Sequence, residues 1–195
     1  MAPGRPNRRA AILAGGRGSR LGGRKPLADL AGRPLISYPL SAAEAAGLDP
    51  FVIAKPQSPL PELDFEVVHE PERPSHPLAG ALAALRAVKN PVVLLGCDMP
   101  FLTGELLAWL GDQEPPAVAV VDGRLQPLLG IYGQSAEPSF TEALAAEAPF
   151  REAVDRLGPR RLGDDELRRF GHPARLAFSV DSPDDLALAS RLLGD

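Results

Sequence analysis

The sequence predicts an α/β fold with a mostly parallel sheet and helices on both faces. Short apolar runs alternate with segments of helical periodicity along most of the 195 residues, and this alternation is typical of parallel strands joined by crossover helices. The run 91–98, PVVLLGCD, is apolar at nearly every position, as expected for a strand buried on both faces of a sheet. We therefore expect a single domain over 1–195, with 1–8 as a flexible basic tail.

The elements of the first half follow from apolar runs and from residues that break regular structure. Pro34 suits the first turn of a helix and Gly47 suits its end. Pro39 should kink the same helix, because proline lacks a backbone donor. Strands are predicted at 9–15, 49–55, 64–70 and 91–98, and helices at 34–47 and 76–88.

The second half continues the pattern with shorter elements. Thr103 is placed to cap a helix, and the turn DGR separates two strands. Ser182-Pro183 followed by Asp184 and Asp185 is a good helix start, so we interpret these two acids as structural. The expected elements are a helix at 103–112, strands at 116–121 and 126–133, mostly helical structure beyond them, and a strand-like stretch at 174–181 before a last helix.

Charge and composition exclude several classes of protein. The net charge of −4 predicts no general affinity for nucleic acid. No apolar run approaches the roughly 20 residues that cross a bilayer, and the apolar segment after the basic N-terminus is too short for a signal peptide. A single cysteine, Cys97, rules out an intrachain disulfide framework and is expected to be a buried core thiol. These features predict a cytoplasmic protein without a membrane partner.

Positive charge gathers near the N-terminus. Residues 1–33 contain eight basic side chains and one acid, so the rest of the chain carries a net charge of −11. Three of the eight belong to the tail. The other five lie within or beside a loop rich in glycine, AGGRGSRLGGRK, which predicts an anionic ligand at that loop.

The spacing of this loop argues against two common nucleotide-binding motifs. It lacks the G-x-x-x-x-G-K-[ST] pattern of a P-loop. Its glycines at 16, 18 and 22 miss the dinucleotide pattern G-x-G-x-x-G by one residue, and the second strand ends in Lys55 instead of an acid. A phosphate cradle is still indicated, because glycines let backbone N–H groups approach an anion while Arg20 and Lys25 neutralise it. The alternative is a mobile surface loop.

Two aspartates follow apolar stretches and are candidate metal ligands. Asp98 closes the predicted central strand, and Met99-Pro100 prevents an immediate helix, which holds the carboxylate at the strand tip. A carboxylate facing a basic phosphate loop suits Mg²⁺ bound against a nucleotide's phosphates; the alternative is a turn or N-cap residue. Asp181 could be a second metal contact or part of the helix start. The three histidines and one cysteine show no zinc spacing.

Parallel sheets bind ligands beyond the carboxyl ends of their strands. The rule places chemistry immediately after the stretches AILAGG, VIAK, VVHE and LLGCD.

Residues 13–36, LAGGRGSRLGGRKPLADLAGRPLI, resemble the opening signature of the nucleotidyltransferases, L-A-G-G-x-x-x-R-M-G followed by a lysine. Four later segments narrow the resemblance to the molybdenum cofactor guanylyltransferases, and they occur in the same order as in that family. These segments are HPLAGALAAL, LLGCDMPFL, QPLLGIY and FSVDSPDDL.

The resemblance implies a three-layer, Rossmann-like domain that transfers GMP from GTP to molybdopterin cofactor and releases pyrophosphate, with Mg²⁺ as cofactor. It implies transient contact with molybdenum-cofactor insertion proteins or molybdoenzymes. Asp98 would bind Mg²⁺ and phosphates, and Lys25 would bind phosphates with the help of Arg20. Glu70 would lie near the nucleotide. Backbone groups of the opening loop would contact the nucleotide at Leu13, Ala14, Gly15 and Gly16.

Three departures from the family pattern keep alternatives open. The segment RLGGRK is one residue shorter than usual, with Arg24 where an acid is expected. His76 replaces a glycine, and Ser179 and Asp181 replace asparagines. The alternatives are transfer from CTP to molybdopterin, transfer from GTP to another phosphorylated acceptor such as a cobinamide or phospholactate, and a nucleotide-binding module without catalysis.

Overall fold

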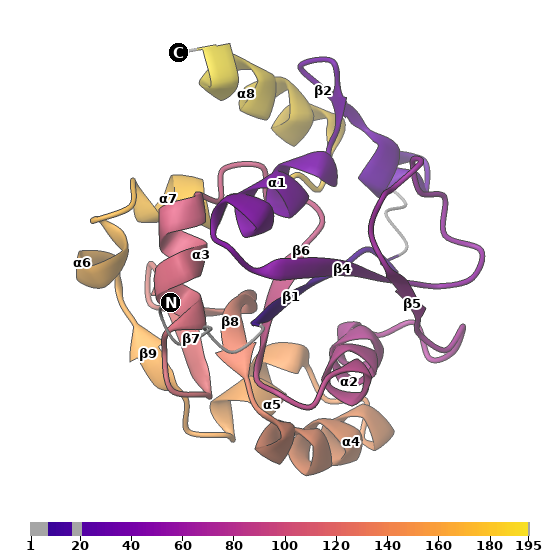
Figure 1. Ribbon diagram of the computed structural model, residues 1–195, viewed down its shortest axis with the longest axis vertical. Helices are drawn as coiled ribbons and strands as arrows, with labels where there is room; N and C mark the ends of the chain where they lie inside the picture. Colours follow the sequence, from indigo (N-terminus) through magenta and orange to yellow (C-terminus); the bar gives the residue numbers. More distant parts are fainter. Residues whose placement is uncertain (1–7, 17–20, 195) are drawn as a thin grey trace, which may run out of the picture.

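The computed structural model describes residues 8–16 and 21–194. Its main sheet has seven strands in the order β5-β4-β1-β6-β8-β7-β9 (Figure 1). Strand β8 is antiparallel to β6 and β7, and all other neighbours pair in parallel. The expected mostly parallel sheet is therefore confirmed. The strands are β1 (Arg9–Leu13), β4 (Asp49–Ala54), β5 (Val67–His69), β6 (Val92–Gly96), β7 (Ala117–Val121), β8 (Arg124–Tyr132) and β9 (Arg160–Leu162).

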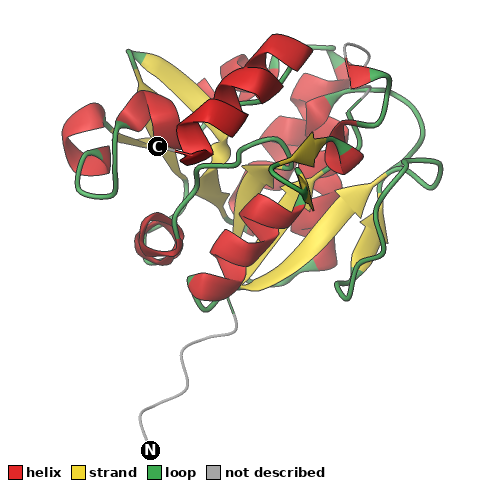
Figure 2. Cartoon of the chain, turned by 90° about the horizontal axis from the view of Figure 1, so that it is seen from above, coloured by secondary structure: helices red, strands yellow, loops and turns green. Residues whose placement is uncertain are grey.

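Helices cover both faces of this sheet, as expected (Figure 2). The central strands supply both cores, since alternate side chains point to opposite faces: Ile12 of β1 packs into one core and Ala11 into the other. Helices α1 (Ser37–Ala45), α3 (Gly104–Gly111), α6 (Asp164–Leu167) and α7 (Pro173–Leu176) contribute to the first core. Helices α2 (Pro77–Ala87), α4 (Glu137–Ala145) and α5 (Phe150–Asp155) contribute to the second.

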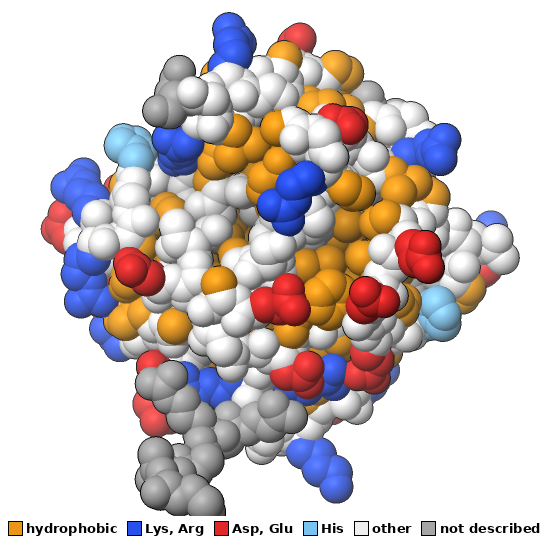
Figure 3. All heavy atoms as spheres, turned by 45° about the horizontal axis from the view of Figure 1, so that its top comes forward, with side chains coloured by type: hydrophobic (Ala, Val, Ile, Leu, Met, Phe, Trp, Pro, Cys, Tyr) orange, Lys and Arg blue, Asp and Glu red, His pale blue; other side chains and the backbone are white. Residues whose placement is uncertain are grey.

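A third, smaller core lies beside the sheet. It joins the two-stranded hairpin β2 (Asp29–Leu30) and β3 (Arg33–Pro34) to α8 (Pro183–Gly194). Figure 3 looks onto this face, where hydrophobic side chains are exposed among scattered acidic and basic ones. Leu188 and Leu193 of α8 are exposed. Within residues 8–16 and 21–194, no helix has the length and apolar character that a membrane span requires.

The predicted helix boundaries have identifiable causes. The Thr103 hydroxyl accepts a hydrogen bond from the backbone N–H of Leu106 at 3.2 Å and caps α3. Gly47 adopts φ +70° immediately beyond α1, a conformation that glycine reaches without steric cost. At the start of α8, the Ser182 hydroxyl donates to Asp185 at 2.7 Å and accepts from its N–H at 3.2 Å. This confirms the structural interpretation of Asp185.

Two local expectations are wrong, and a third is confirmed only in part. Pro39 does not kink α1, because it lies in the first turn, where a backbone N–H has no helical partner to lose. The stretch 174–181 forms no strand: it begins in α7, whose first residue is Pro173, and continues as an irregular segment. The predicted strand at 64–70 is regular only over Val67–His69. Strand β9 and the β2–β3 hairpin were not anticipated by the sequence pattern.

Candidate nucleotide-binding site

A cavity of about 350 Å³ lies at the carboxyl ends of β1 and β6. Three of the four stretches in which chemistry was expected contribute to its wall, and the fourth, which ends at Lys55, lines an adjoining cavity. The site residues expected from the sequence are thereby brought together, except Arg20, which lies outside the described residues. Those lining this cavity are Leu13, Ala14, Gly15, Gly16, Lys25, Glu70 and Asp98.

Glu70 is the buried acid of this cavity, with 6% of its surface exposed. Its carboxylate approaches two glycines so closely that a side chain at either would collide with it. A Cβ atom at Gly80 would lie 2.9 Å from Oε2, and one at Gly15 would overlap Oε1. The residues that the structure describes donate no hydrogen bond to this carboxylate. Burial raises the pKa of Glu70, and the positive charge of Lys55 opposes the rise.

Lys25 joins two aspartates that are distant in the sequence. It begins the short helix η2 (Lys25–Leu27), directly after the glycine-rich loop. Its Nζ donates to Oδ2 of Asp98 and, at 2.6 Å, to Oδ1 of Asp181. The side chains of Lys25 and Asp98 are 15% and 16% exposed, whereas that of Asp181 is 59% exposed. Burial alone would lower the pKa of Lys25, but the negative charges and hydrogen bonds of both aspartates outweigh it and raise the pKa.

The segment before α8 is fixed to the end of β6 by two further contacts. The Ser179 hydroxyl donates to Oδ2 of Asp98 at 2.8 Å, and the backbone N–H of Val180 donates to the carbonyl oxygen of Asp98 at 2.9 Å. These bonds hold the segment so that Asp181, which belongs to no strand, reaches Lys25. The sequence analysis noted Ser179 only as a departure from a family pattern and did not predict it as a site residue. The structure shows its hydroxyl group in contact with Asp98 and Asp181.

The donor set suits a hard divalent cation. Oxygens of Asp98 and Asp181 already converge on one cationic group, the Lys25 ammonium, and a hydroxyl stands beside them. No cluster of three or more His, Cys, Asp or Glu residues that could hold a metal exists within the described ranges. Mg²⁺ is commonly bound by one or two carboxylates together with substrate phosphates and not by a closed protein cage. The residues present therefore fit Mg²⁺.

Two other residues of the cavity wall have structural reasons for their positions. Cys97 is a free, buried thiol, as expected, and burial raises its pKa far above the ordinary value. His76 precedes α2, where its Nδ1 accepts a hydrogen bond from the backbone N–H of Leu78 at 3.2 Å. This bond places the proton of neutral His76 on Nε2.

Comparison with known proteins extends this description. The family described as the MobA-like NTP transferase domain matches residues 10–162. The chain belongs to this family. It is therefore a nucleotidyltransferase. The matched range begins in β1 and ends in β9, so it contains Lys25, Glu70 and Asp98 but not Asp181.

Individual relatives of this MobA-like protein cover nearly its whole length. A molybdenum cofactor guanylyltransferase from Cereibacter sphaeroides is 33% identical over 194 residues, which are 93% of this chain and 95% of that protein. A molybdenum cofactor guanylyltransferase from Pseudomonas putida is 35% identical over 182 residues, 85% and 93% of the two chains. The crystal structure of molybdopterin-guanine dinucleotide biosynthesis protein A from Archaeoglobus fulgidus superposes with a TM-score of 0.79 at 23% identity, covering 95% of this chain and 98% of that one. This likeness confirms the α/β fold.

Proposed function

We propose that this protein transfers GMP from GTP to molybdopterin cofactor and releases pyrophosphate, in a reaction that depends on Mg²⁺. The observation that carries the proposal is the agreement between relatives and site. Relatives of more than 30% identity that bear this activity in their name span both chains almost fully. The charged residues that such a transfer requires meet in one cavity.

The transfer requires alignment and neutralisation of charge more than covalent help from the protein. A phosphate oxygen of the acceptor forms a bond to the α-phosphorus of GTP. The bond from that phosphorus to the bridging oxygen breaks, and pyrophosphate leaves with the electron pair. Lys25 would bind the phosphates from one side of the cavity, with Arg20 as its expected helper. Backbone groups at Leu13, Ala14, Gly15 and Gly16 would hold the nucleotide against the end of β1.

Asp98, with Asp181 as a second ligand, would hold Mg²⁺. The ion, when bound, supplies positive charge that offsets the charge developing on the phosphates. Lys25 keeps the two carboxylates together and offsets part of their negative charge in the nucleotide-free protein. Ser179 restrains Asp98 through its hydrogen bond and so fixes the direction of that carboxylate.

Glu70 would bind the base. Its buried carboxylate accepts no hydrogen bond from the described residues, and guanine presents a ring N–H beside an amino group, two donors that a carboxylate can accept together. Cytosine presents a single amino donor beside a ring nitrogen that accepts, so a carboxylate gains one hydrogen bond instead of two and is repelled by the neighbouring acceptor. This contrast supports GTP over CTP as the donor nucleotide.

The proposal is tested first by thermal unfolding with Mg²⁺ and, in turn, GTP, CTP, ATP and NAD. A ligand at about 100 times its Kd adds roughly 2.7 kcal/mol to the free energy of unfolding, which raises Tm by about 5–10 °C in a chain of this size. We expect the rise with GTP alone and its loss in Lys25→Ala. A rise with CTP would assign a cytidylyl transfer, and no rise with any nucleotide would contradict the proposal.

The second measurement is pyrophosphate release with GTP and molybdopterin. Release with both substrates, and its loss in Asp98→Ala, is the expected result. An Asp98→Ala protein with full turnover would contradict the assignment. GTP binding without pyrophosphate release would indicate a nucleotide-binding module, and contact with insertion proteins or molybdoenzymes would then be its expected role.

A further inference from the structure

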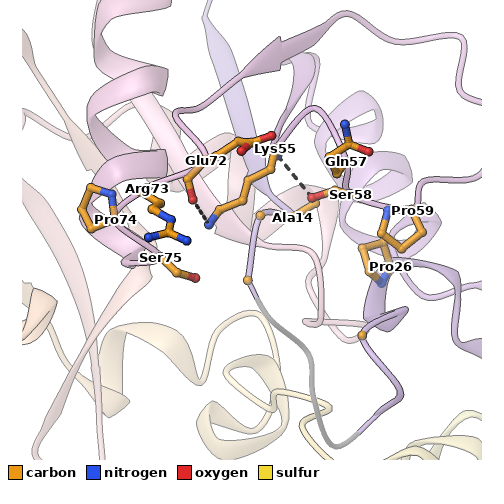
Figure 4. A pocket seen from close by; sticks show the side chains of 13 residues that line it. Ala14, Pro26, Lys55, Gln57, Ser58, Pro59, Glu72, Arg73, Pro74 and Ser75 are labelled. Atoms are coloured by element: carbon orange, nitrogen blue, oxygen red, sulfur yellow. Dashed lines mark hydrogen bonds between the residues drawn. The ribbon is translucent and has the colours of Figure 1, made fainter.

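A second and larger cavity, of about 840 Å³, adjoins the first. We call it the outer lobe. The two cavities share the wall Ala14–Gly16 and Ser75. The far side of the outer lobe consists of the segments that follow β4 and β5 (Figure 4). The proposed function gives a role to the shared wall Ala14–Gly16 but none to the residues of the far side.

Two cationic side chains point into the outer lobe from different segments. Lys55 follows β4 and is half-buried, and Arg73 follows β5 and is exposed. Figure 4 shows their charged ends extending toward the same region of the lobe, next to Ser75. The Lys55 ammonium is held there by a hydrogen bond to the carbonyl oxygen of Glu72 at 2.8 Å.

Neither Lys55 nor Arg73 forms an ion pair within the described part of the chain, although the charge of Lys55 also favours the ionised carboxylate of Glu70 in the adjoining cavity. The ion pairs found there engage Lys25 and several exposed arginines, such as Arg86 and Arg160, but neither Lys55 nor Arg73. The side chain of Glu72 also lines the lobe, so the wall carries two positive charges and one negative charge. The lobe therefore has an excess of positive charge, which attracts an anionic ligand.

Several polar groups of the lobe can donate hydrogen bonds to a ligand. The Lys55 ammonium keeps two N–H groups after its bond to Glu72, and the guanidinium of Arg73 offers a planar fork that matches an oxyanion. The Ser58 hydroxyl accepts from the backbone N–H of Lys55 at 3.2 Å and retains its own proton for donation. The Ser75 hydroxyl lies on the wall shared with the first cavity.

The position of the lobe indicates which oxyanion reaches it. Gly16 and Gly23 line it, and these residues belong to the glycine-rich loop that faces the phosphates in the proposed function. We propose that the outer lobe is an oxyanion subsite in which Lys55 and Arg73 bind a phosphate or pyrophosphate group. The inference rests on the proposed function for the place of the nucleotide. The group is either the β- and γ-phosphates of the nucleotide, with the pyrophosphate that they become, or the phosphate of the acceptor.

The test is calorimetric titration of the full chain with inorganic pyrophosphate. The variants are Lys55→Gln, Arg73→Gln and the double variant. Lys89→Gln is the matched control, because Lys89 is an exposed lysine beyond α2 with no part in either cavity. We expect Kd for pyrophosphate to rise at least fivefold in each single variant, further in the double variant, and not in the control. The difference should shrink at high salt.

Equal pyrophosphate affinity in the wild type and the double variant would overturn the proposal, and so would a wild type that does not bind pyrophosphate. Titration with GTP and GMP distinguishes the two sources. Weaker GTP binding with unchanged GMP binding in the double variant would assign the lobe to the β- and γ-phosphates. Unchanged binding of both nucleotides, with a raised KM for molybdopterin, would assign it to the acceptor.

The failure of this inference is distinguishable from failure of the proposed function. A wild type that does not bind GTP contradicts the proposed function. A second outcome contradicts the oxyanion subsite alone. In that outcome the wild type binds GTP and Lys25→Ala does not, but the affinity for pyrophosphate is the same with and without Lys55 and Arg73. Unchanged Tm values of the variants without ligand verify that the comparison is between folded proteins.

Discussion

The ammonium group of Lys25 lies 2.6 Å from Oδ1 of Asp181, although 156 positions separate the two residues. The same ammonium binds the carboxylate of Asp98, 73 positions away. One side chain thus connects the glycine-rich loop, the end of β6 and the start of α8. The proposed nucleotide site depends on all three segments, which together supply one positive and two negative charges.

Replacing Lys25 by alanine should destabilise the protein in a way that Mg²⁺ reverses. The change leaves the carboxylates of Asp98 and Asp181 facing each other without a cation. Because the ion pairs of Lys25 with the two aspartates are partly solvent-exposed, we expect the free energy of unfolding to fall by about 1–2 kcal/mol, which lowers Tm by a few degrees. Millimolar Mg²⁺ should restore Tm by occupying the place of the ammonium.

The control for this experiment is Arg191→Ala, an exposed cation in the last turn of α8. We expect this substitution to change Tm little, and we expect Mg²⁺ to change the Tm of the variant little. A Lys25→Ala protein whose Tm is insensitive to Mg²⁺ would argue against a divalent cation at the two aspartates.

The two aspartates should differ in their importance for activity. Asp98 is 16% exposed and held by Ser179, whereas Asp181 is 59% exposed. We expect Asp98→Asn to lower kcat at least about 100-fold, the scale of a lost electrostatic contact in a transition state. Asp181→Asn should cost about tenfold and raise the Mg²⁺ concentration required for half-maximal rate.

Pyrophosphate release measured against Mg²⁺ concentration checks this ranking. Asp184→Asn, in the exposed first turn of α8, is the matched control and should behave as the wild type. If Asp181→Asn proved as inactive as Asp98→Asn, the two carboxylates would share the metal equally and the ranking by burial would be wrong.

The buried carboxylate of Glu70 should lower the free energy of unfolding, and it should strengthen the binding of GTP. Its pKa is raised by burial, so the native state binds the proton more tightly than the unfolded state, and stability falls as pH rises through this range. At pH 7, Glu70→Gln should therefore raise the free energy of unfolding by about 1 kcal/mol. Below the ordinary carboxyl pKa of 4.5 the advantage should disappear.

Thermal unfolding of both proteins from pH 4 to pH 8 measures the effect, and GTP titration measures its functional counterpart. We expect Glu70→Gln to bind GTP about tenfold more weakly, since one carboxylate oxygen becomes a donor. A variant that is less stable than the wild type at pH 7 would show that Glu70 is satisfied by its surroundings.

The sheet and the strand-tip positions of the site could be predicted from sequence because they depend on local patterns. Apolar runs define β1, β4 and β6, and the residue after each run must stand at the same edge of a parallel sheet. Lys25 and Asp98 could be proposed from the glycine-rich loop and the strand end without knowledge of their contact. The roles of Thr103 and Gly47 at helix ends could also be predicted, because they depend on residues within four positions in the sequence.

Features that depend on distant contacts could not be predicted in this way. The place of Asp181 follows from the hydrogen bond between Val180 and Asp98, and nothing in the segment itself indicates that partner. The outer lobe joins two irregular segments, after β4 and after β5, whose charges have no periodicity. The kink expected at Pro39 was wrong because the helix begins only at Ser37, a boundary that lacks a side-chain cap.

A methyl group at Gly80 should weaken GTP binding while leaving the fold intact. Gly80 lies inside α2, where alanine is favoured over glycine by about 1 kcal/mol. Its Cβ would stand 2.9 Å from Oε2 of Glu70 and 3.2 Å from Cδ2 of Leu13, so the buried carboxylate must move. We expect Gly80→Ala to weaken GTP binding at least tenfold with Tm unchanged within a few degrees.

Two further variants separate this explanation from a general effect of the substitution. Gly194→Ala is the matched control, because a Cβ at this exposed position of α8 meets no atom within 4 Å, and its GTP affinity should equal that of the wild type. In a Glu70→Ala background the added methyl group has no carboxylate to displace, so the two substitutions should be strongly non-additive. If Gly80→Ala weakened GTP binding by the same factor in both backgrounds, the contact between Gly80 and Glu70 could not be the cause, and the narrowing of the cavity beside Leu13 would have to explain the loss.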